Sequence, residues 1–419
     1  MPDPAYLPRI ADAELREALG AAGAVVIQGP KACGKTRMAQ QLAASTVLLD
    51  VDPAARQALA VDPALLLEGA RPRLLDEWQV APELWNQVRR AVDGAAAPGQ
   101  FLLTGSAVPA DDAARHTGAG RFSFVRLRPM TLAESGAAPG GVSLAALLAG
   151  EPAHCADPGL GVKDLAELVC RGGWPGQRAS SLKAASRAAR DYLEQVRQVD
   201  VQRLEGRRRD PQRLGGLLRA LARGVATEVS LNTLAADAGG GDGPLDPRTV
   251  ADHLEALERL MVLEPQLAWR PHLRSKAALR QAPRRHFCDP SLAVAALGAG
   301  PERLLADLAW LGQLFESLVI RDLRVLAQAL DGEVFHYRDN YGVEVDAIVQ
   351  LRDGRWGAIE IKLGAGQVEA AAASLLRFQR QLDLSRTGAP AFLAVACGKG
   401  YGYRRPDGIS VLPVGALGL

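Results

Sequence analysis

Eight residues near the N-terminus constrain the fold of this chain more than any others. The stretch GPKACGKT, residues 29–36, matches the phosphate-loop pattern G-x-x-x-x-G-K-[ST]. It follows the buried-strand run AVVIQ and precedes a helical pattern, which is the setting that this motif requires. Its glycines allow backbone N–H groups to curl around phosphates. The sequence therefore predicts an ATP site lined by Gly29, Pro30, Lys31, Ala32, Cys33, Gly34, Lys35, Thr36 and Arg37.

Two further segments are expected to complete this site. Lys35 would reach the β- and γ-phosphates, and Thr36 would hold Mg²⁺. In RPRLLDEWQ, two leucines lead into Asp76, which would hold Mg²⁺ through water, and Glu77, which could polarise the attacking water. ATP and Mg²⁺ are therefore the expected cofactors.

A third apolar run, FLLT, ends in GSA. Thr104 or Ser106 could position water or sense the γ-phosphate, or the segment could be only a strand-terminal turn. Farther along, GAGRF contains Arg121, which could act as an arginine finger toward a neighbouring subunit. In that case the protein would be an oligomer, whereas a plain surface arginine is the alternative.

The alternation of patterns divides the chain into four parts. Residues 1–135 alternate short apolar strands with helical stretches, which predicts an α/β domain with a parallel sheet. Residues 136–226 are expected to be a connector and a helical lid. Residues 227–290 are expected to form a winged-helix-like module of two helices and a strand, and residues 291–419 a second α/β domain.

A role on DNA would have to come from local patches, because the formal net charge is only +2. Two stretches, residues 203–224 and 270–286, are rich in arginine and flank the predicted winged helix. Against DNA contact, its second helix carries Asp252, Glu255 and Glu258, which would repel phosphates. DNA binding through this module therefore stays open.

The segment VEVDAIVQLRDGRWGAIEIKLG predicts a β-hairpin. A two-residue loop would place Asp346 on the face opposite to Glu360, but a three-residue loop with Gly354 in the left-handed conformation places the two carboxylates opposite each other. We expect the three-residue loop. Apolar residues back both strands, so the polar face would be a surface or a cleft.

Two adjacent carboxylates repel unless something neutralises them, and a divalent ion on Asp346 and Glu360 would do so. Lys362 could orient water or stabilise charge, and Glu316 could add a third carboxylate from the preceding helix. The alternative is a solvated strand face with one ion pair.

The order of helix glutamate, aspartate and E-x-K resembles the PD-(D/E)XK nuclease fold, although Val345 stands where that pattern has proline. The resemblance implies that Glu316, Asp346, Glu360 and Lys362 are catalytic.

The chain as a whole is similar to prokaryotic AAA-type ATPases that carry a C-terminal domain of unknown function related to these nucleases. The motifs that carry this resemblance include VVIQGPKACGKT, RLLDEWQ, FLLTGSA, GAGRF, GGWPG, FESLVIRDL and AIEIK. It implies an AAA+-like P-loop domain, a winged-helix middle and a restriction-endonuclease-like end. Two functions follow as expectations. One is an ATPase that controls a DNA-directed, nucleolytic domain; the other is an ATP-gated DNA- or protein-binding switch whose nuclease-like domain is inactive.

The sequence also bears on the compartment. No apolar run approaches the roughly 20 residues of a membrane span. The first ten residues contain prolines and charges and lack the apolar core of a signal peptide. The five cysteines are an odd number without a C-x-x-C pair, which is typical of reduced thiols. We therefore expect a cytoplasmic protein without a membrane partner.

Overall fold

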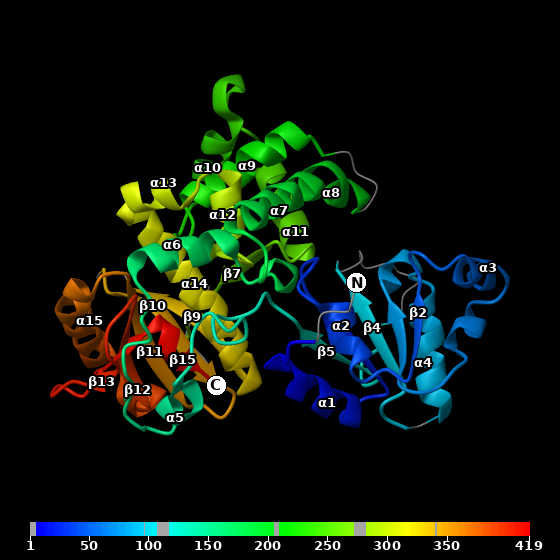
Figure 1. Cartoon of the computed structure of the whole chain (residues 1–419), viewed down its shortest axis with the longest axis horizontal. Coiled ribbons are helices and arrows are strands. Elements are labelled where there is room, and N and C mark those ends of the chain that lie inside the picture. Colours follow the sequence, from blue (N-terminus) through cyan, green and yellow to red (C-terminus); the bar gives the residue numbers. More distant parts are fainter. Residues whose placement is uncertain (1–5, 96, 107–116, 205–208, 272–281, 340–341) are drawn as a thin grey trace. The chain divides into compact units, whose positions relative to one another are not determined.

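The computed structural model describes residues 6–95, 97–106, 117–204, 209–271, 282–339 and 342–419 (Figure 1). Two compact units are present. The first comprises Met1–Arg128 with the short segments Arg203–Arg207 and Arg259–Met261, and the second comprises Pro129–Gln202, Arg208–Glu258 and Val262–Leu419. The predicted boundaries at 135, 226 and 290 stay predictions. Parts of both arginine-rich stretches, residues 205–208 and 272–281, lie outside the described residues.

A five-stranded, wholly parallel sheet forms the centre of the first unit, as the alternating pattern predicted. Its strand order is β2-β3-β4-β1-β5. The strands are β1 (Ala24–Gln28), β2 (Ser45–Leu48), β3 (Arg73–Asp76), β4 (Phe101–Gly105) and β5 (Phe122–Arg126). The helices are α1 (Ala11–Ala21), α2 (Lys35–Gln40), α3 (Pro53–Val61) and α4 (Leu84–Ala95).

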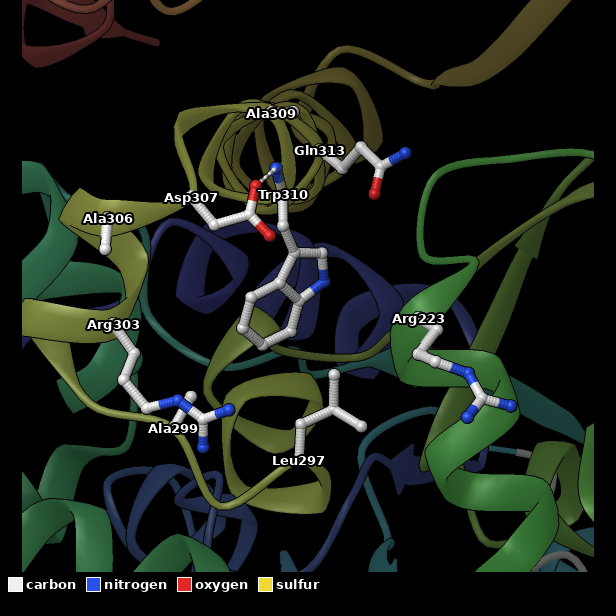
Figure 2. Close-up of a pocket in the computed structure, with 9 residues that line it drawn as sticks. All are labelled: Arg223, Leu297, Ala299, Arg303, Ala306, Asp307, Ala309, Trp310 and Gln313. Atoms are coloured by element: carbon white, nitrogen blue, oxygen red, sulfur yellow. Dashed lines mark hydrogen bonds between the residues drawn. The ribbon is translucent and has the colours of Figure 1, made fainter. Parts of the chain in front are cut away.

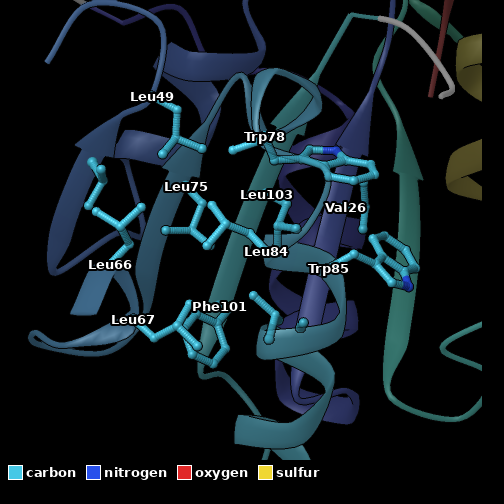
Figure 3. Packing of buried hydrophobic residues seen from close by; sticks show 14 of the residues in the cluster. Val26, Leu49, Leu66, Leu67, Leu75, Trp78, Leu84, Trp85, Phe101 and Leu103 are labelled. Carbon is cyan, nitrogen blue, oxygen red and sulfur yellow. The ribbon is translucent and has the colours of Figure 1, made fainter. Parts of the chain in front are cut away.

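Helix α4 packs its apolar face on this sheet. Val26, Leu75 and Leu103 come from three neighbouring strands and lie beside Leu84 and Trp85 at the start of the helix (Figure 3). Strands that are covered on both faces are apolar along their whole length, which explains why β1 and β4 are uninterrupted runs without polar alternation. The core therefore fixes the carboxyl ends of β1, β3 and β4 beside one another.

The first part of the second unit is mostly helical. Its helices are α5 (Leu144–Leu148), α6 (Val162–Arg171), α7 (Leu182–Gln195), α8 (Val201–Arg203), α9 (Pro211–Arg223), α10 (Leu231–Gly239), α11 (Pro247–Arg259), α12 (Pro290–Ala296), α13 (Pro301–Ala306) and α14 (Leu308–Ala329). An antiparallel ribbon of β7 (Leu263–Gln266) and β8 (Arg284–Phe287) follows α11. The order of helix, helix and ribbon agrees with the predicted pattern, and the winged-helix interpretation itself stays a prediction.

A six-stranded mixed sheet forms the C-terminal part of the second unit. Its order is β13-β14-β12-β11-β10-β9, antiparallel from β9 to β11 and parallel from β11 through β12 to β14. The strands are β9 (Gly332–Arg338), β10 (Glu344–Leu351), β11 (Trp356–Lys362), β12 (Phe392–Cys397), β13 (Tyr403–Arg404) and β14 (Ser410–Pro413). A short parallel pair joins β6 (Val142–Ser143) to β15 (Leu417–Gly418).

Helix α15 (Val368–Gln381) follows β11, and the short helix α16 (Leu384–Thr387) precedes β12. The apolar face of α15 packs with Leu375 and Phe378 against Ile348 and Trp356 of the sheet. Within the described part of the chain, no helix is long and apolar enough to cross a membrane.

Candidate functional sites

The phosphate loop lies between β1 and α2, as predicted. Gly34 has φ +105°, a left-handed conformation that favours glycine, and the helix begins at the next residue, Lys35. The Lys35 side chain is buried, and its Nζ donates hydrogen bonds of 2.9 Å to the carbonyl oxygens of Gly29 and Pro30. The ammonium group is therefore held directly over the loop.

Thr36 and Asp76 are 40 residues apart in the sequence, yet Thr36 Oγ1 donates a hydrogen bond of 2.8 Å to Asp76 Oδ1. Thr104 Oγ1 donates to the same carboxylate oxygen. The strand order explains the meeting, because β4, which carries Thr104, lies between β1 and β3. Three residues predicted from separate motifs therefore form one hydroxyl–carboxylate cluster.

Glu77 begins the turn after β3 and adopts φ +56°, which is uncommon for a residue other than glycine. Its backbone N–H donates to Thr104 Oγ1 at 3.2 Å. Its Oε2 accepts hydrogen bonds from the Gln79 amide and, at 3.4 Å, from Ser106 Oγ. The carboxylate of Glu77 is thereby oriented beside the cluster of Asp76.

Arg9 is a residue of this site that sequence reasoning missed. Its guanidinium donates to the carbonyl oxygen of Cys33 in the loop at 3.0 Å and to that of Arg128 at 2.8 Å. The Cys33 thiol in turn donates to the carbonyl oxygen of Leu127 at 3.4 Å. These contacts fasten the phosphate loop to the end of β5. No sequence pattern marks one arginine twenty residues before the motif as its support.

Arg121 immediately precedes β5 and lies at the amino-terminal ends of the strands, whereas the phosphate loop follows the carboxyl end of β1. Its carbonyl accepts from Ala24 at the start of β1, whereas the phosphate loop follows the end of β1, about 16 Å away along a five-residue strand. The Arg121 side chain forms a half-exposed ion pair of 2.8 Å with Asp93. This position is remote from the ATP site of its own chain. Only a role toward a neighbouring subunit stays open for this residue.

The hairpin register agrees with the three-residue loop. Ala347 pairs with Ile359 and Gln350 with Trp356, and this offset brings Asp346 level with Glu360. Gly354 has φ +93°. One feature of β10 was not expected, because its pairing with β9 shifts by one residue between Val345 and Ile348. The alternation of side chains between the two faces of β10 is therefore interrupted at this point.

The residues predicted for the C-terminal site do meet. Lys362 Nζ lies 2.9 Å from Asp346 Oδ2 and 2.7 Å from Glu360 Oε2. Asp346 Oδ2 also accepts the backbone N–H of Ile361 at 2.9 Å. These carboxylates do not lie on an open surface, because Asp346 is 8% exposed and Glu360 is 5% exposed, and the cleft that the sequence left as the other possibility stays a prediction. Buried carboxylates of this kind are paired with cations, which explains the contacts of Lys362.

Arg284, on β8, is the second cation of the cluster, and sequence reasoning did not single it out. Its Nη1 lies 3.0 Å from Glu316 Oε1 and 3.2 Å from Asp346 Oδ1, and its Nη2 lies 3.1 Å from Glu344 Oε2. The other oxygen of Glu344 pairs with Arg338 at 3.2 Å. The four predicted residues and these neighbours are called the carboxylate cluster below: Arg284, Glu316, Glu344, Asp346, Glu360 and Lys362.

The charges in the carboxylate cluster are unequal. Burial and the neighbouring Asp346 raise the pKa of Glu316 to about 8 against the influence of Arg284. Burial and Asp346 likewise raise the pKa of Glu360 to about 8, although Lys362 opposes them. Burial would also raise the pKa of Asp346, but Lys362 and Arg284 outweigh it and hold this pKa below its usual range. At neutral pH, Asp346 is the firmly ionised member of these three acids.

The donors of this cluster do not fit the divalent ion predicted for Asp346 and Glu360. Both oxygens of Asp346 already face protein cations or an N–H group, and one oxygen of Glu316 faces Arg284. Among the described residues, no group of three or more His, Cys, Asp or Glu side chains is arranged to hold a metal ion. The hydroxyl of Thr36 and the carboxylate of Asp76, by contrast, are adjacent oxygen donors of the kind that Mg²⁺ accepts.

A separate pocket of about 520 Å³ lies in the second unit. Its lining comes from the ends of α9, α12 and α13 and the start of α14, and it consists of Arg223, Leu297, Ala299, Arg303, Ala306, Asp307, Ala309, Trp310 and Gln313. In Figure 2, the Trp310 indole points into this space, with Arg303 and Arg223 on its two sides. The indole is fixed, because its Nε1 donates to the carbonyl oxygen of Ala222 at 3.0 Å. None of the residues predicted for either site lines this pocket.

Three known families match consecutive parts of the chain. Residues 21–136 match an AAA domain (AAA_14), residues 162–303 a domain of unknown function (DUF8612), and residues 311–417 another domain of unknown function (DUF4143). The first match covers the phosphate loop, Asp76, Glu77 and Thr104. Residues 21–136 are therefore an ATP-binding domain of the AAA type.

The names of two relatives assign no activity that could be compared with this chain. Uncharacterized proteins of Mycobacterium bovis and Mycobacterium tuberculosis are each 26% identical over 365 residues, which covers 84% of this chain and 73% of theirs. Among solved structures, a Walker-type ATPase of Pyrococcus abyssi is 14% identical with a TM-score of 0.41, covering 68% of this chain and 94% of that one.

Proposed function

We propose that the first unit hydrolyses ATP with Mg²⁺ and that the second unit responds to its nucleotide state. The observation that carries the ATPase proposal is the hydrogen bond of 2.8 Å between Thr36 Oγ1 and Asp76 Oδ1. It joins the phosphate loop to the acidic strand end, the pair of groups that holds Mg²⁺ in P-loop enzymes. Mg²⁺, when bound, would neutralise charge on the transferred phosphoryl group.

The side chains around this pair have distinct proposed roles. Lys35 is placed to exchange its two loop carbonyls for phosphate oxygens. Glu77 is the proposed base that orients and polarises water, and Gln79 and Ser106 hold its carboxylate. Thr104 keeps Asp76 and the Glu77 backbone at fixed positions. Gln79 is a positioning residue in this scheme, because it acts through Glu77.

Two substitutions test the proposal. Lys35→Ala is expected to abolish ATP binding, whereas Glu77→Gln is expected to keep binding and lose turnover. Lys163→Ala and Glu83→Gln are matched controls, because both side chains are exposed and lie outside the loop. Binding would be followed with a fluorescent ATP analogue and turnover by phosphate release. Full turnover in Lys35→Ala would refute the proposal.

A second candidate function is contact of the second unit with single-stranded DNA. The pocket at Trp310 favours it, because an aromatic ring between two arginines suits a base and its flanking phosphates. Arg223 also forms an ion pair of 3.6 Å with Asp237, and this exposed pair is easily exchanged for a phosphate. DNA affinity measured at several salt concentrations should fall in the double variant Arg223→Ala/Arg303→Ala. It should not fall in the matched variant Arg187→Ala on α7, and equal affinity in all three proteins would exclude this pocket.

The sequence left two possibilities for the C-terminal domain, a nuclease and an inactive nuclease-like domain. We propose that this domain does not cleave DNA. The meeting of Glu316, Asp346, Glu360 and Lys362 supports a nuclease-like ancestry, but Arg284 lies where a shared cation would be needed. Single-stranded, duplex and branched DNA would be incubated with Mg²⁺ or Mn²⁺, with and without ATP. Cleavage that disappears in Lys362→Ala would show that the nucleolytic alternative is correct.

A further inference from the structure

One guanidinium group neutralises the carboxylate cluster from its centre. Arg284 contacts three carboxylates within 3.2 Å, those of Glu316 on α14 and of Glu344 and Asp346 on β10. Only 5% of Arg284 is exposed. A buried cation with several carboxylate partners keeps its charge, and these carboxylates raise the pKa of Arg284 although its burial opposes them. The cluster therefore contains a permanent positive charge.

The carboxylates of the cluster are already paired with the cations Arg284 and Lys362. Asp346 lies between the two, because its Oδ1 is 3.2 Å from Arg284 Nη1 and its Oδ2 is 2.9 Å from Lys362 Nζ. Glu360 Oε2 lies 2.7 Å from the same Lys362 Nζ. The cluster is thus balanced by side chains of this protein, and a second cation of charge +2 would be repelled by the first.

The ribbon of β7 and β8 holds Arg284 in place. Gln266, which pairs with Arg284 across the ribbon, donates 2.9 Å hydrogen bonds to the carbonyl oxygens of Asp346 and Phe335. The neighbouring Arg285 donates to the carbonyl oxygen of Val229 at 2.6 Å. The backbone of Arg284 is therefore held beside the cluster by the residues that flank it on the ribbon.

We propose that Arg284 is the resident cation of this site and takes the place of a divalent metal ion. While the guanidinium is present, the cluster binds neither Mg²⁺ nor Mn²⁺. Without it, Glu316 Oε1 and Asp346 Oδ1, which both contact Arg284 Nη1, are left facing one vacated position that a divalent ion can occupy. The inference rests on the proposed non-cleaving function and supplies its physical cause, and it is independent of the ATPase.

Mn²⁺ binding to the nucleotide-free, full-length protein tests the proposal by electron paramagnetic resonance titration. The wild type and Arg284→Lys, which keeps the charge, are expected to bind no Mn²⁺ at the carboxylate cluster, so adding Asp346→Asn should not change their titrations. Arg284→Met removes the charge at similar volume and is expected to bind one Mn²⁺ per chain more than the wild type. That binding should be lost again in Arg284→Met/Asp346→Asn. Circular dichroism would confirm that each variant is folded.

Two results would overturn the proposal. One is a wild-type protein that binds Mn²⁺ at a site removed by Asp346→Asn, and this comparison remains decisive even if Arg284→Met does not fold. The other is a folded Arg284→Met protein that binds no Mn²⁺. Phosphate release from ATP, measured on the same samples, reports the ATPase separately. Cleavage of DNA by the wild type without a metal site at Asp346 would refute the non-cleaving function and leave the Arg284 inference intact.

Discussion

The carboxylate of Asp346 accepts the backbone N–H of Ile361 at 2.9 Å, so a side chain satisfies a donor where the two strands of the hairpin cease to pair. Backbone pairing between β10 and β11 extends only to Ala347 and Ile359. The same carboxylate binds Lys362 and Arg284. Asp346 therefore combines a structural role for the hairpin with an electrostatic role for the cluster.

Asp346→Ala should destabilise the second unit by about 3 kcal/mol, because Arg284 and Lys362 each lose a buried carboxylate partner. The free N–H of Ile361 adds to the loss. Chemical unfolding followed by tryptophan fluorescence would measure the change. Asp353→Ala in the exposed turn of the same hairpin is the control, and its midpoint should not move. Equal midpoints for both variants would contradict the structural role of Asp346.

The stability of the second unit should fall as the pH rises from 6 to 8.5. The pKa values of Glu316 and Glu360 are raised from 4.5 to about 8, so these groups bind their protons more tightly in the folded state. Their contribution to the free energy of unfolding is complete below pH 4.5, the pKa of these groups in the unfolded chain. It is lost as the pH rises through about 8, their pKa in the folded protein. The lowered pKa of Asp346 acts in the opposite direction, but only near the acidic limit.

Melting temperatures at the two pH values check this expectation. The wild type should lose about 3 °C or more between pH 6 and pH 8.5. Glu360→Gln, which keeps the shape of the protonated side chain, should lose less over the same range. Glu369→Gln is the control, because its carboxylate is exposed on α15 and pairs with Arg405. A slope that is the same in the wild type and Glu360→Gln would contradict the raised pKa of Glu360.

Gly29→Ala should abolish ATP binding. A Cβ atom on Gly29 would lie 2.1 Å from the carbonyl oxygen of Leu127 and 2.9 Å from the Cys33 sulfur, so the loop would be forced away from β5. Gly20→Ala on α1 is the matched control, since nothing lies within 4 Å of its added Cβ. Titration with a fluorescent ATP analogue would separate them. Normal affinity in Gly29→Ala would show that the loop tolerates this displacement.

Thr104→Val should slow ATP turnover by about 100-fold while ATP still binds, because it removes the hydroxyl that joins Asp76 to the Glu77 backbone. The shape of the side chain is nearly preserved. Thr46→Val on β2 is the control, because Thr46 is exposed. Phosphate release at saturating ATP measures the effect. Unchanged turnover with Thr104→Val would assign Thr104 to packing alone.

The sequence was sufficient wherever a motif fixes both residue type and local geometry. The phosphate loop was located from its glycines and lysine, and β1 from the apolar run before it. The hairpin register could be derived because only one loop length unites Asp346 and Glu360, and Gly354 suits that loop. These inferences depend on contacts that are close in sequence or on a strand period of two.

Contacts between distant segments could not be derived in the same way. Arg284 precedes Asp346 by 62 residues and belongs to an arginine-rich stretch that suggested DNA contact. Nothing in its local pattern shows that it turns inward. Arg9 likewise gives no signal of its contact with Cys33. Charge balance is the physical signal that points to a second cation, because buried carboxylates require cations and Lys362 alone does not suffice for the three acids Glu316, Asp346 and Glu360.

The predicted arginine finger can act only between subunits. Arg121 lies beside the start of β1, whereas the phosphate loop follows its end, so it is remote from the ATP site of its own chain. Mixing two inactive variants tests the role in a neighbouring subunit. Arg121→Ala has an intact ATP site, and Lys35→Ala has an intact Arg121. If Arg121 acts as an arginine finger, turnover should rise when the two proteins are mixed. The Lys35→Ala protein then supplies its Arg121 to the intact ATP site of the Arg121→Ala protein.

Each variant measured alone provides the baseline, and Arg89→Ala on α4 controls for loss of an arginine that also pairs with Asp93. Arg121→Ala alone should reduce turnover by about 1000-fold if the residue stabilises the transition state. If Arg121→Ala and Arg89→Ala have equal turnover, Arg121 has no catalytic role and serves only as an ion-pair partner of Asp93. Strong loss in Arg121→Ala without rescue on mixing would instead place its effect on the fold of β5.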